Sequence, residues 1–231
     1  MERTNECALC SQVAGRKQGD LLAQLLDAGE KYMRRVGPES QGFAVIPSVG
    51  PLTVGHVLLC PKFHYTSFAR VPRDLWPEYR AMKAELTDLL ETAFSRAVHI
   101  FEHGTDARCS RVICSVEHAH QHFVPADVDV WDRLHGGIDW VEIPSGIDHL
   151  ERAVREGEYL LYEAPGRHPI VAVARESRFE SQHIRRVFAE ALGVPEKWNW
   201  RQYPLPEDIE ATFKAISAAL KKEAVPIDVS S

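Results

Sequence analysis

Three histidines alternate with other residues in the middle of the chain: His118, His120 and His122. Successive side chains of a β-strand point to opposite faces, so in a strand all three imidazoles would leave the same face. The apolar residues at both ends of the segment 116–124 suit a half-buried strand. Protonated imidazoles in one row repel one another, and buried neutral imidazoles each need a hydrogen-bond or metal partner. The row therefore indicates a chemical function, and the alternative is a solvated edge strand or a chance cluster in a loop.

Two cysteines near the N-terminus, Cys7 and Cys10, have the spacing at which a pair of thiolates binds one metal ion. The pair would fill two of the four positions of a tetrahedral zinc site, and histidines from distant strands can fill the others. The alternative is that both cysteines start a helix and have a packing role. The chain has five cysteines and its first residues lack the apolar core of a signal peptide, which together argue against a disulfide framework.

A sheet and a long helix are needed to position these residues. Apolar periodicity predicts a short helix over residues 19–29, followed by an antiparallel meander. A run of apolar residues at helical spacing predicts a helix over 72–98, which should cover one face of the sheet. We expect a five-stranded antiparallel sheet with strands over residues 31–36, 42–47, 54–62, 99–102 and 115–124.

Past Pro125 the pattern changes, so we divide the chain into a core, residues 1–127, and a C-terminal extension, residues 128–231. Ser181 is the expected N-cap of a helix in the extension. The aromatic segment 198–203 should pack over the core and shape one side of a pocket, unless it only fills a core between two modules. Elements of the extension are expected over residues 139–143 (strand), 147–155 (helix), 158–163 and 170–174 (hairpin), 181–192 and 207–222 (helices).

The composition is that of an ordinary globular protein, with 231 residues, 45% apolar and 26% charged, and a formal net charge of −6. No basic run or aromatic–basic ladder indicates a general nucleic-acid binder, and no apolar run is long enough to span a bilayer. A small anionic ligand is compatible with this balance, because a local site can be positive on an acidic protein. We expect a cytoplasmic protein, monomeric or homodimeric, that binds neither nucleic acid nor membrane.

The chain resembles the histidine-triad (HIT) family in three motifs that occur in that family's order. They are the cysteine pair, the strand–turn–strand segment 43–64 with its Gly55-His56 step, and the His-x-His-x-His row. The resemblance covers about residues 5–127. It implies an α+β fold, a HIT-like antiparallel β-sheet with a covering helix, to which this chain adds a C-terminal α/β extension.

The resemblance implies a role for each histidine. His120 matches the family's nucleophile, which forms a covalent phosphoryl- or nucleotidyl-histidine, and the carbonyl of His118 would accept its inner N–H. His122 matches the residue that contacts the phosphate and assists the leaving group, and His56 matches a further histidine beside the row. Relatives of galactose-1-phosphate uridylyltransferase have Gln at the third position of the row, so a histidine there favours hydrolysis or phosphorolysis over hexose-phosphate uridylyl transfer.

The resemblance also implies the remaining metal ligands. His64 and His118 would join Cys7 and Cys10 around a structural zinc ion, Zn²⁺. With all four positions filled by protein, the ion would fix the strand without touching the substrate.

The stretches expected to bind the nucleotide depart from the family pattern. Of the family's Asn-Gly and Gly-Gln-Ser segments before the row, only a glycine and Ser115 remain, and the ribose-contacting acid is replaced by Ser48. Lys62 and Arg111 are candidates to take over phosphate binding. These four substrate-binding candidates leave the catalytic row itself unchanged.

The sequence therefore predicts a HIT-like hydrolase or transferase that cleaves a phosphoanhydride, phosphoester or phosphoramidate bond of a nucleotide through a covalent His120 intermediate. The alternative is a nucleotide-binding or sensing protein with the fold and the structural zinc but little turnover. A module in which only the zinc ligands matter is disfavoured by the intact His120 and His122.

Overall fold

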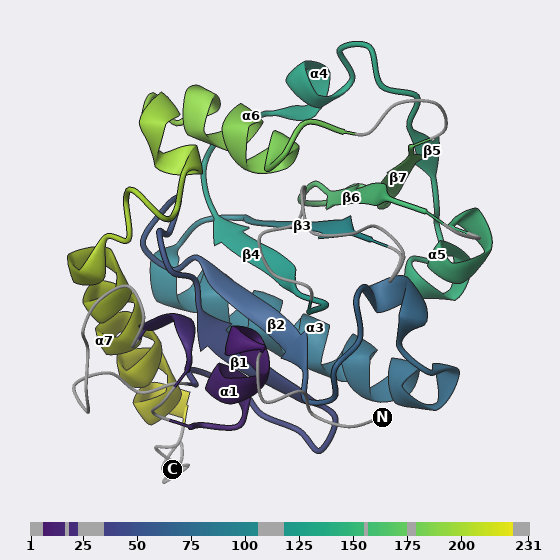
Figure 1. The fold of residues 1–231 in the computed structure, drawn as a ribbon. Helices are drawn as coiled ribbons and strands as arrows, with labels where there is room; N and C mark the ends of the chain where they lie inside the picture. The colour runs from purple at the N-terminus through teal and green to yellow at the C-terminus, as the bar shows by residue number, and fades with distance from the viewer. Residues whose placement is uncertain are drawn as a thin grey trace, which may run out of the picture.

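The computed structural model describes residues 7–16, 19–22, 35–105, 118–154, 157–174 and 179–223. Within this part of the chain, the strands form one antiparallel sheet in the order β1-β2-β4-β3-β6-β7-β5 (Figure 1). Helices pack on the sheet, which confirms the predicted α+β class. The strands are β1 Phe43–Pro47, β2 Val57–Pro61, β3 Val98–Gly104, β4 Gln121–Pro125, β5 Val141–Glu142, β6 Tyr159–Glu163 and β7 Ile170–Val173.

The helices carry the numbers of Figure 1 and differ greatly in length. The longest, α3, follows two short 3-10 turns, η1 Phe68–Arg70 and η2 Arg73–Leu75, and a third turn, η3 Pro195–Trp198, follows α6. None of the helices in the described ranges combines the length and apolar character that a membrane-spanning helix requires. The α-helices are α1 Ala8–Val13, α3 Trp76–Phe94, α4 Trp131–Leu134, α5 Ile147–Ala153, α6 His183–Ala191 and α7 Pro206–Glu223.

Alternate residues of the strands face two different layers of helices. On one face, Phe43, Val57 and Phe123 pack against residues of α3, and α7 packs on α3 in turn (Figure 1). On the other face, α1 packs against β1 and β2, and α6 packs against a cluster that includes Phe101 and Tyr162. Each fully buried large apolar side chain contributes about 1.5–3 kcal/mol relative to exposure, so both layers stabilise the sheet.

The sheet has seven strands rather than the predicted five, and its membership also differs. The strands of the extension continue the same sheet, because residues 100–104 of β3 pair with residues 159–163 of β6. The predicted strand over 31–36 is wrong for Arg35 and Val36, which lie outside any strand, while residues 31–34 are not among those described. The division of the chain at residue 127 stays a prediction, and the sheet is continuous across it.

The histidine row does not lie wholly in a strand, contrary to the prediction. β4 begins at Gln121, so only His122 is in the strand, while His118 and His120 precede it. The amide between these two histidines donates to the carbonyl of Tyr65 at 2.6 Å, outside the ladder that β4 forms with its neighbours. The chain therefore enters the sheet only after the first two histidines.

The expected alternation of faces nevertheless holds within β4. Gln121 faces α3, where its Oε1 accepts a hydrogen bond from the Tyr79 hydroxyl at 2.8 Å. His122 faces the opposite layer, where its ring stacks on Phe101 with 4.4 Å between ring centroids. The catalytic candidates are thereby kept on the face away from α3.

Most other elements lie near their predicted ranges, with shifted ends. The predicted helix over 72–98 begins as an α-helix only at Trp76 and ends at Phe94, where Ser95 takes a left-handed conformation with φ of 52°. The predicted N-cap Ser181 is wrong, because the residue before α6 is Gln182, with φ of 60° and no side-chain cap. Of the helix expected over 19–29, only residues 21 and 22 are helical within the described ranges.

The C-terminal part is fastened to the turn between β1 and β2. The Gly50 N–H donates to the carbonyl of Pro204 at 3.0 Å, and the Gly55 N–H donates to the Thr212 hydroxyl at 2.8 Å. Gly50 has a φ of +63°, and a Cβ there would lie 2.6 Å from the Cα of Trp200, so this close approach requires glycine. The segment around Trp200 thus packs over the core, as the sequence predicts.

Candidate active site and metal centre

Two cysteines at the start of α1 converge with two histidines, one of which follows β2 while the other precedes β4. One donor atom from each of Cys7, Cys10, His64 and His118 lies within 4.8 Å of all the others. Cys10 Sγ is 3.3 Å from Nδ1 of both histidines, and Cys7 Sγ is 3.7 Å from Nδ1 of His118. Tetrahedral bonds of about 2.3 Å to sulfur and 2.0–2.1 Å to nitrogen would separate the two atom types by about 3.5 Å. The cluster therefore has the geometry to hold one metal ion.

Hydrogen bonds to the surrounding backbone favour the metal-binding forms of His118 and Cys7. The Nε2–H of His118 donates to the carbonyl of Pro61 at 2.8 Å, which leaves the Nδ1 lone pair directed at the cluster. Hydrogen bonds from the side chain and the backbone N–H of Cys10 lower the pKa of Cys7, so its thiolate form is favoured. Thiolates and neutral imidazoles are the forms that bind metals.

One ring nitrogen of His120 is hydrogen-bonded to the backbone, and the other keeps its lone pair. Its Nδ1–H donates to the carbonyl of His118 at 2.6 Å. A carbonyl only accepts, so the proton of the neutral ring lies on Nδ1 and Nε2 keeps its lone pair. Burial lowers the pKa of His120 to about 4, so the ring is neutral near pH 7. Nε2 of His120 is therefore available as a nucleophile.

The rings of His56 and His122 form a chain of hydrogen bonds with defined direction. The Leu52 N–H donates to Nδ1 of His56 at 3.0 Å, so neutral His56 carries its proton on Nε2. Nε2 of His56 lies 2.9 Å from Nδ1 of His122, to which it donates. Neutral His122 therefore carries its proton on Nε2, and that N–H has no hydrogen-bond partner within the described residues. The row thus presents one lone pair, on His120, and one donor, on His122.

Acid should destabilise the fold through these buried rings. Burial lowers the pKa of His56 and His122 well below 6.5, the value expected in the unfolded chain. The unfolded state therefore binds more protons below pH 6.5, and stability is lost as the pH falls through that window. The loss is at most about 1.4 kcal/mol per pH unit for each ring. Urea unfolding at pH 7, 6 and 5 measures it.

The control is His122→Gln, since an amide at this position does not titrate. This variant should lose less stability than the wild type between pH 7 and pH 5. Identical pH dependence in the two proteins would show that His122 does not resist protonation in the folded state.

His120 and His122 border a narrow cavity of about 40 Å³. Such a volume is well below that of a whole small-molecule pocket, and suits only the group that reacts. The residues that line it come from both halves of the chain: Leu9, Leu21, Ser48, Val49, Leu58, His120, His122, Gln182, Arg185 and Trp200. His56 does not line the cavity and reaches it through His122.

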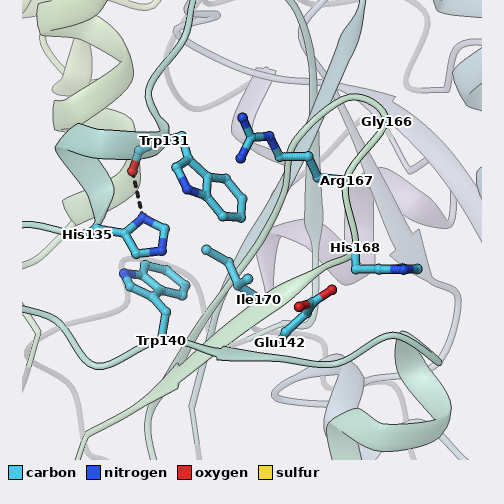
Figure 2. A pocket seen from close by; sticks show the side chains of 8 residues that line it. All are labelled: Trp131, His135, Trp140, Glu142, Gly166, Arg167, His168 and Ile170. Carbon is cyan, nitrogen blue, oxygen red and sulfur yellow. Dashed lines mark hydrogen bonds between the residues drawn. The ribbon is translucent and has the colours of Figure 1, made fainter.

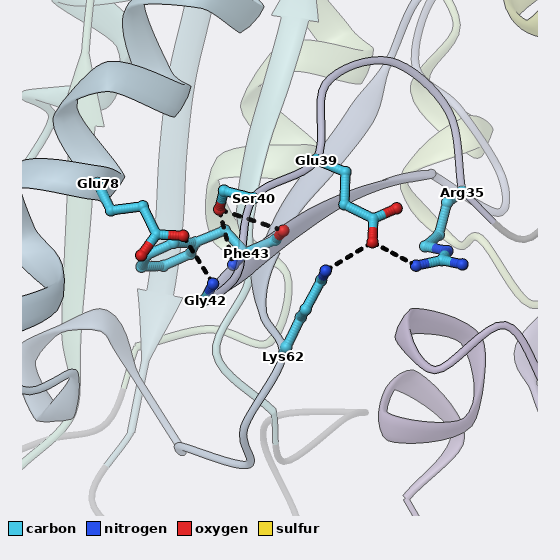
Figure 3. Close-up of polar contacts among 7 residues, drawn as sticks. All are labelled: Arg35, Glu39, Ser40, Gly42, Phe43, Lys62 and Glu78. Carbon is cyan, nitrogen blue, oxygen red and sulfur yellow. Dashed lines mark hydrogen bonds and ion pairs between the residues drawn. The ribbon is translucent and has the colours of Figure 1, made fainter.

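The structure brings together only part of the predicted substrate-binding set. Ser48 is buried and lines the cavity with the histidines. Lys62 lies elsewhere, where its Nζ pairs with Glu39 at 2.6 Å, and Glu39 also pairs with Arg35 at 2.6 Å (Figure 3). Arg111 and Ser115 lie outside the described residues.

Two lining residues, Arg185 and Gln182, do not figure among the sequence-based candidates. A signal for Arg185 was present, because it lies three and four residues before Phe188 and Ala189 and so shares their buried face of α6. The polar residues just before it, including His183, instead suggest that this end of the helix is exposed to solvent. The position of Gln182 has no comparable signal in the sequence.

A second, larger cavity of about 560 Å³ opens at the β5 edge of the sheet (Figure 2). The Arg167 guanidinium lies 4.4 Å from the centre of the Trp131 ring, and the His135 Nδ1–H donates to the Trp131 carbonyl at 2.7 Å. β3, β6 and β7 separate this edge from β4, so the cavity is distinct from the histidine row. It is lined by Trp131, His135, Trp140, Glu142, Gly166, Arg167, His168 and Ile170.

Comparison with known proteins gives matches among solved structures alone. No protein-family model and no curated protein matches the chain. A hypothetical histidine triad nucleotide-binding protein from Sulfolobus tokodaii is 20% identical, with 52% of this chain and 68% of that chain aligned and a TM-score of 0.36. A histidine triad protein from Clostridium difficile is 15% identical over 55% and 95% of the two chains, with a TM-score of 0.38.

A member of the HIT family from Bacillus subtilis is 15% identical, with 65% of this chain and 96% of that chain aligned and a TM-score of 0.39. All three matched structures are histidine-triad proteins. The cysteine pair, the Gly55-His56 turn and the histidine row are the motifs in which the sequence resembles the same family.

Proposed function

We propose that the protein is a HIT-like hydrolase or transferase that cleaves a phosphoanhydride, phosphoester or phosphoramidate bond of a nucleotide. The reaction would pass through a covalent intermediate on His120. One observation carries the proposal: the Nδ1–H of His120 is bonded to the His118 carbonyl, and the ring borders the cavity. This arrangement keeps the nucleophilic lone pair on Nε2, which is the atom that the chemistry requires.

In the first step, the Nε2 lone pair of His120 attacks phosphorus. A nitrogen–phosphorus bond forms, the bond to the leaving group breaks, and the leaving group takes the bonding electrons. The ring becomes an imidazolium whose Nδ1–H remains on the His118 carbonyl. The Nε2–H of His122 donates to a phosphoryl oxygen and stabilises its charge.

In the second step, water or another acceptor attacks phosphorus. The nitrogen–phosphorus bond breaks, its electron pair returns to Nε2 of His120, and the acceptor's proton is released. Water as the acceptor gives hydrolysis, and phosphate gives phosphorolysis. The histidine at position 122 favours these two outcomes over hexose-phosphate uridylyl transfer, by the resemblance to the family.

We propose zinc as the ion of the metal centre, with a structural role. Two thiolates and two imidazoles are a donor set that zinc favours, and all four positions would be filled by protein. His118 offers its ring to the ion and its carbonyl to His120. The ion would therefore hold the nucleophile in place without taking part in the reaction.

A second candidate function is nucleotide sensing with little turnover. The missing Asn and Gln of the family pattern favour it. The two candidates share the binding of a phosphate group beside the row, and they differ in whether the intermediate is released.

The proposal predicts that a labelled histidine can be trapped. The wild-type protein is incubated with nucleoside 5′-phosphoramidates, dinucleoside polyphosphates and nucleoside triphosphates, and quenched in alkaline denaturant because a nitrogen–phosphorus bond is labile in acid. Mass spectrometry should find the added phosphoryl or nucleotidyl group on His120, together with released nucleotide. Label without release would favour the sensing function. Binding with neither label nor product would contradict the covalent route.

A further inference from the structure

Arg185 is a buried cation that has no carboxylate partner among the described residues. It has 3% of its surface exposed, yet its hydrogen bonds within the described chain go only to backbone carbonyls. Nη2 donates to Gly50 at 2.7 Å and to Lys197 at 3.2 Å, and Nε donates to Trp198 at 3.2 Å. No ion pair of Arg185 occurs within the described ranges. Burying a charge without a counter-charge is costly, which makes such an arginine unusual unless an anion binds to it.

The third guanidinium nitrogen, Nη1, has no hydrogen-bond partner in the described chain. Arg185 lines the same cavity as His120 and His122. The three carbonyls thus hold the guanidinium in a fixed orientation beside the cavity that the histidine row borders.

Among the described lining residues, Arg185 is the only arginine or lysine. The others are apolar or neutral, apart from the two histidines. Of the two cations expected from the sequence, Lys62 is paired with Glu39 and does not line the cavity, and Arg111 lies outside the described residues. A phosphoryl group attacked by His120 would therefore meet one positive charge among the described lining residues, that of Arg185.

We propose that Arg185 binds the non-bridging oxygens of the phosphoryl group that His120 attacks, so that the C-terminal extension completes the active site. The inference rests on the proposed function and adds an oxyanion-binding residue to it. Nε and Nη2 are committed to the carbonyls, and Nη1 of the planar guanidinium still offers two N–H donors to phosphate oxygens. The anchoring carbonyls keep those donors in place before the substrate arrives, so little reorganisation accompanies the reaction.

The test compares two neighbouring arginines of α6 in the full-length protein. Arg185→Gln removes the proposed anion contact, and Arg186→Gln is the matched control, because Arg186 stacks on Trp198 and does not line the cavity. Binding of inorganic phosphate and of AMP is measured by calorimetry, and turnover is measured on the best substrate of the wild type. Arg185→Gln should weaken binding of both anions at least about tenfold and lower kcat/KM about 10²–10³-fold, while Arg186→Gln keeps both.

Unchanged anion binding in folded Arg185→Gln would overturn the inference, even if the wild type turns over nucleotides as proposed. Conversely, a wild type that turns over no nucleotide but loses phosphate binding in Arg185→Gln alone would overturn the proposed function and support the anion site. If Arg185→Gln does not fold, the wild type labelled with ¹⁵N-arginine decides. Phosphate should then shift the side-chain resonance of Arg185 and leave that of Arg186 in place, and an unmoved Arg185 resonance overturns the inference.

Discussion

Replacing His120 by alanine should abolish turnover while the fold and the metal content stay unchanged. The ring borders the cavity and supplies none of the four donor atoms of the metal cluster, and it touches the cluster residue His118 only at the backbone carbonyl, so its loss should leave both intact. A covalent route has no substitute atom at that position, and the loss in kcat should be about 10⁴–10⁶-fold. Steady-state kinetics of the variant, with circular dichroism and metal analysis on the same preparation, measure the effect.

Two further variants sharpen this test. His120→Gly should recover part of the activity with added imidazole, because the free base can occupy the vacated space. His122→Ala should be less severe, at about 10²–10⁴-fold, since a positioned donor assists but forms no bond to phosphorus. Full activity in His120→Ala would end the assignment of the nucleophile and leave the metal centre unaffected.

Removing a metal ligand should have the largest effect on stability. The purified protein is expected to contain one zinc ion per chain, and Cys7→Ser or Cys10→Ser should lower that content and the melting temperature together. Structural zinc binds with an apparent free energy of about 10–16 kcal/mol in small domains, and this energy is part of the folding energy. Atomic emission spectroscopy and thermal unfolding, with and without a chelator, give the two readouts.

The matched control is Cys60→Ala. Cys60 is buried in β2 within the cluster that packs on α1, and it is not one of the four converging residues. This variant should lose about 1 kcal/mol from the cavity that it creates and keep its zinc. Zinc content that is equally high in Cys7→Ser would show that the cluster is not the metal site.

Short-range relations in the sequence account for the parts of the site that could be predicted. Cys7 and Cys10 converge because they lie three positions apart at a helix start, and His120 bonds to the carbonyl of the residue two positions before it. Such contacts depend on local geometry, which spacing expresses directly. The two faces of β4 could also be predicted, because side chains alternate along any strand whichever strand it pairs with.

Contacts between residues far apart in the sequence could not be predicted from the pattern of residue types. The apolar alternation of β6 indicates a strand but does not identify β3 as its neighbour, so the seven-stranded sheet could not be derived. Lys62 has the positive charge of a phosphate ligand, and only the fold reveals that its Nζ lies 2.6 Å from Oε1 of Glu39. Arg185 was missed for the same reason, because its carbonyl partner Gly50 is 135 residues away.

The junction of Gly55 and Thr212 also bears on when, during synthesis, the cavity beside the histidine row is completed. The hydrogen bond that fastens the His56 turn joins residues that are 157 positions apart. A ribosome that adds about 5–20 residues per second needs roughly 10–30 seconds to make the intervening chain. Between the addition of residue 122 and that of residue 185, the nascent polypeptide contains the histidine row but lacks Arg185, Trp200 and α7. A translation product that stops in this interval would carry His120 without the side of the cavity that Arg185 and Trp200 form, so the cavity is complete only near the end of synthesis.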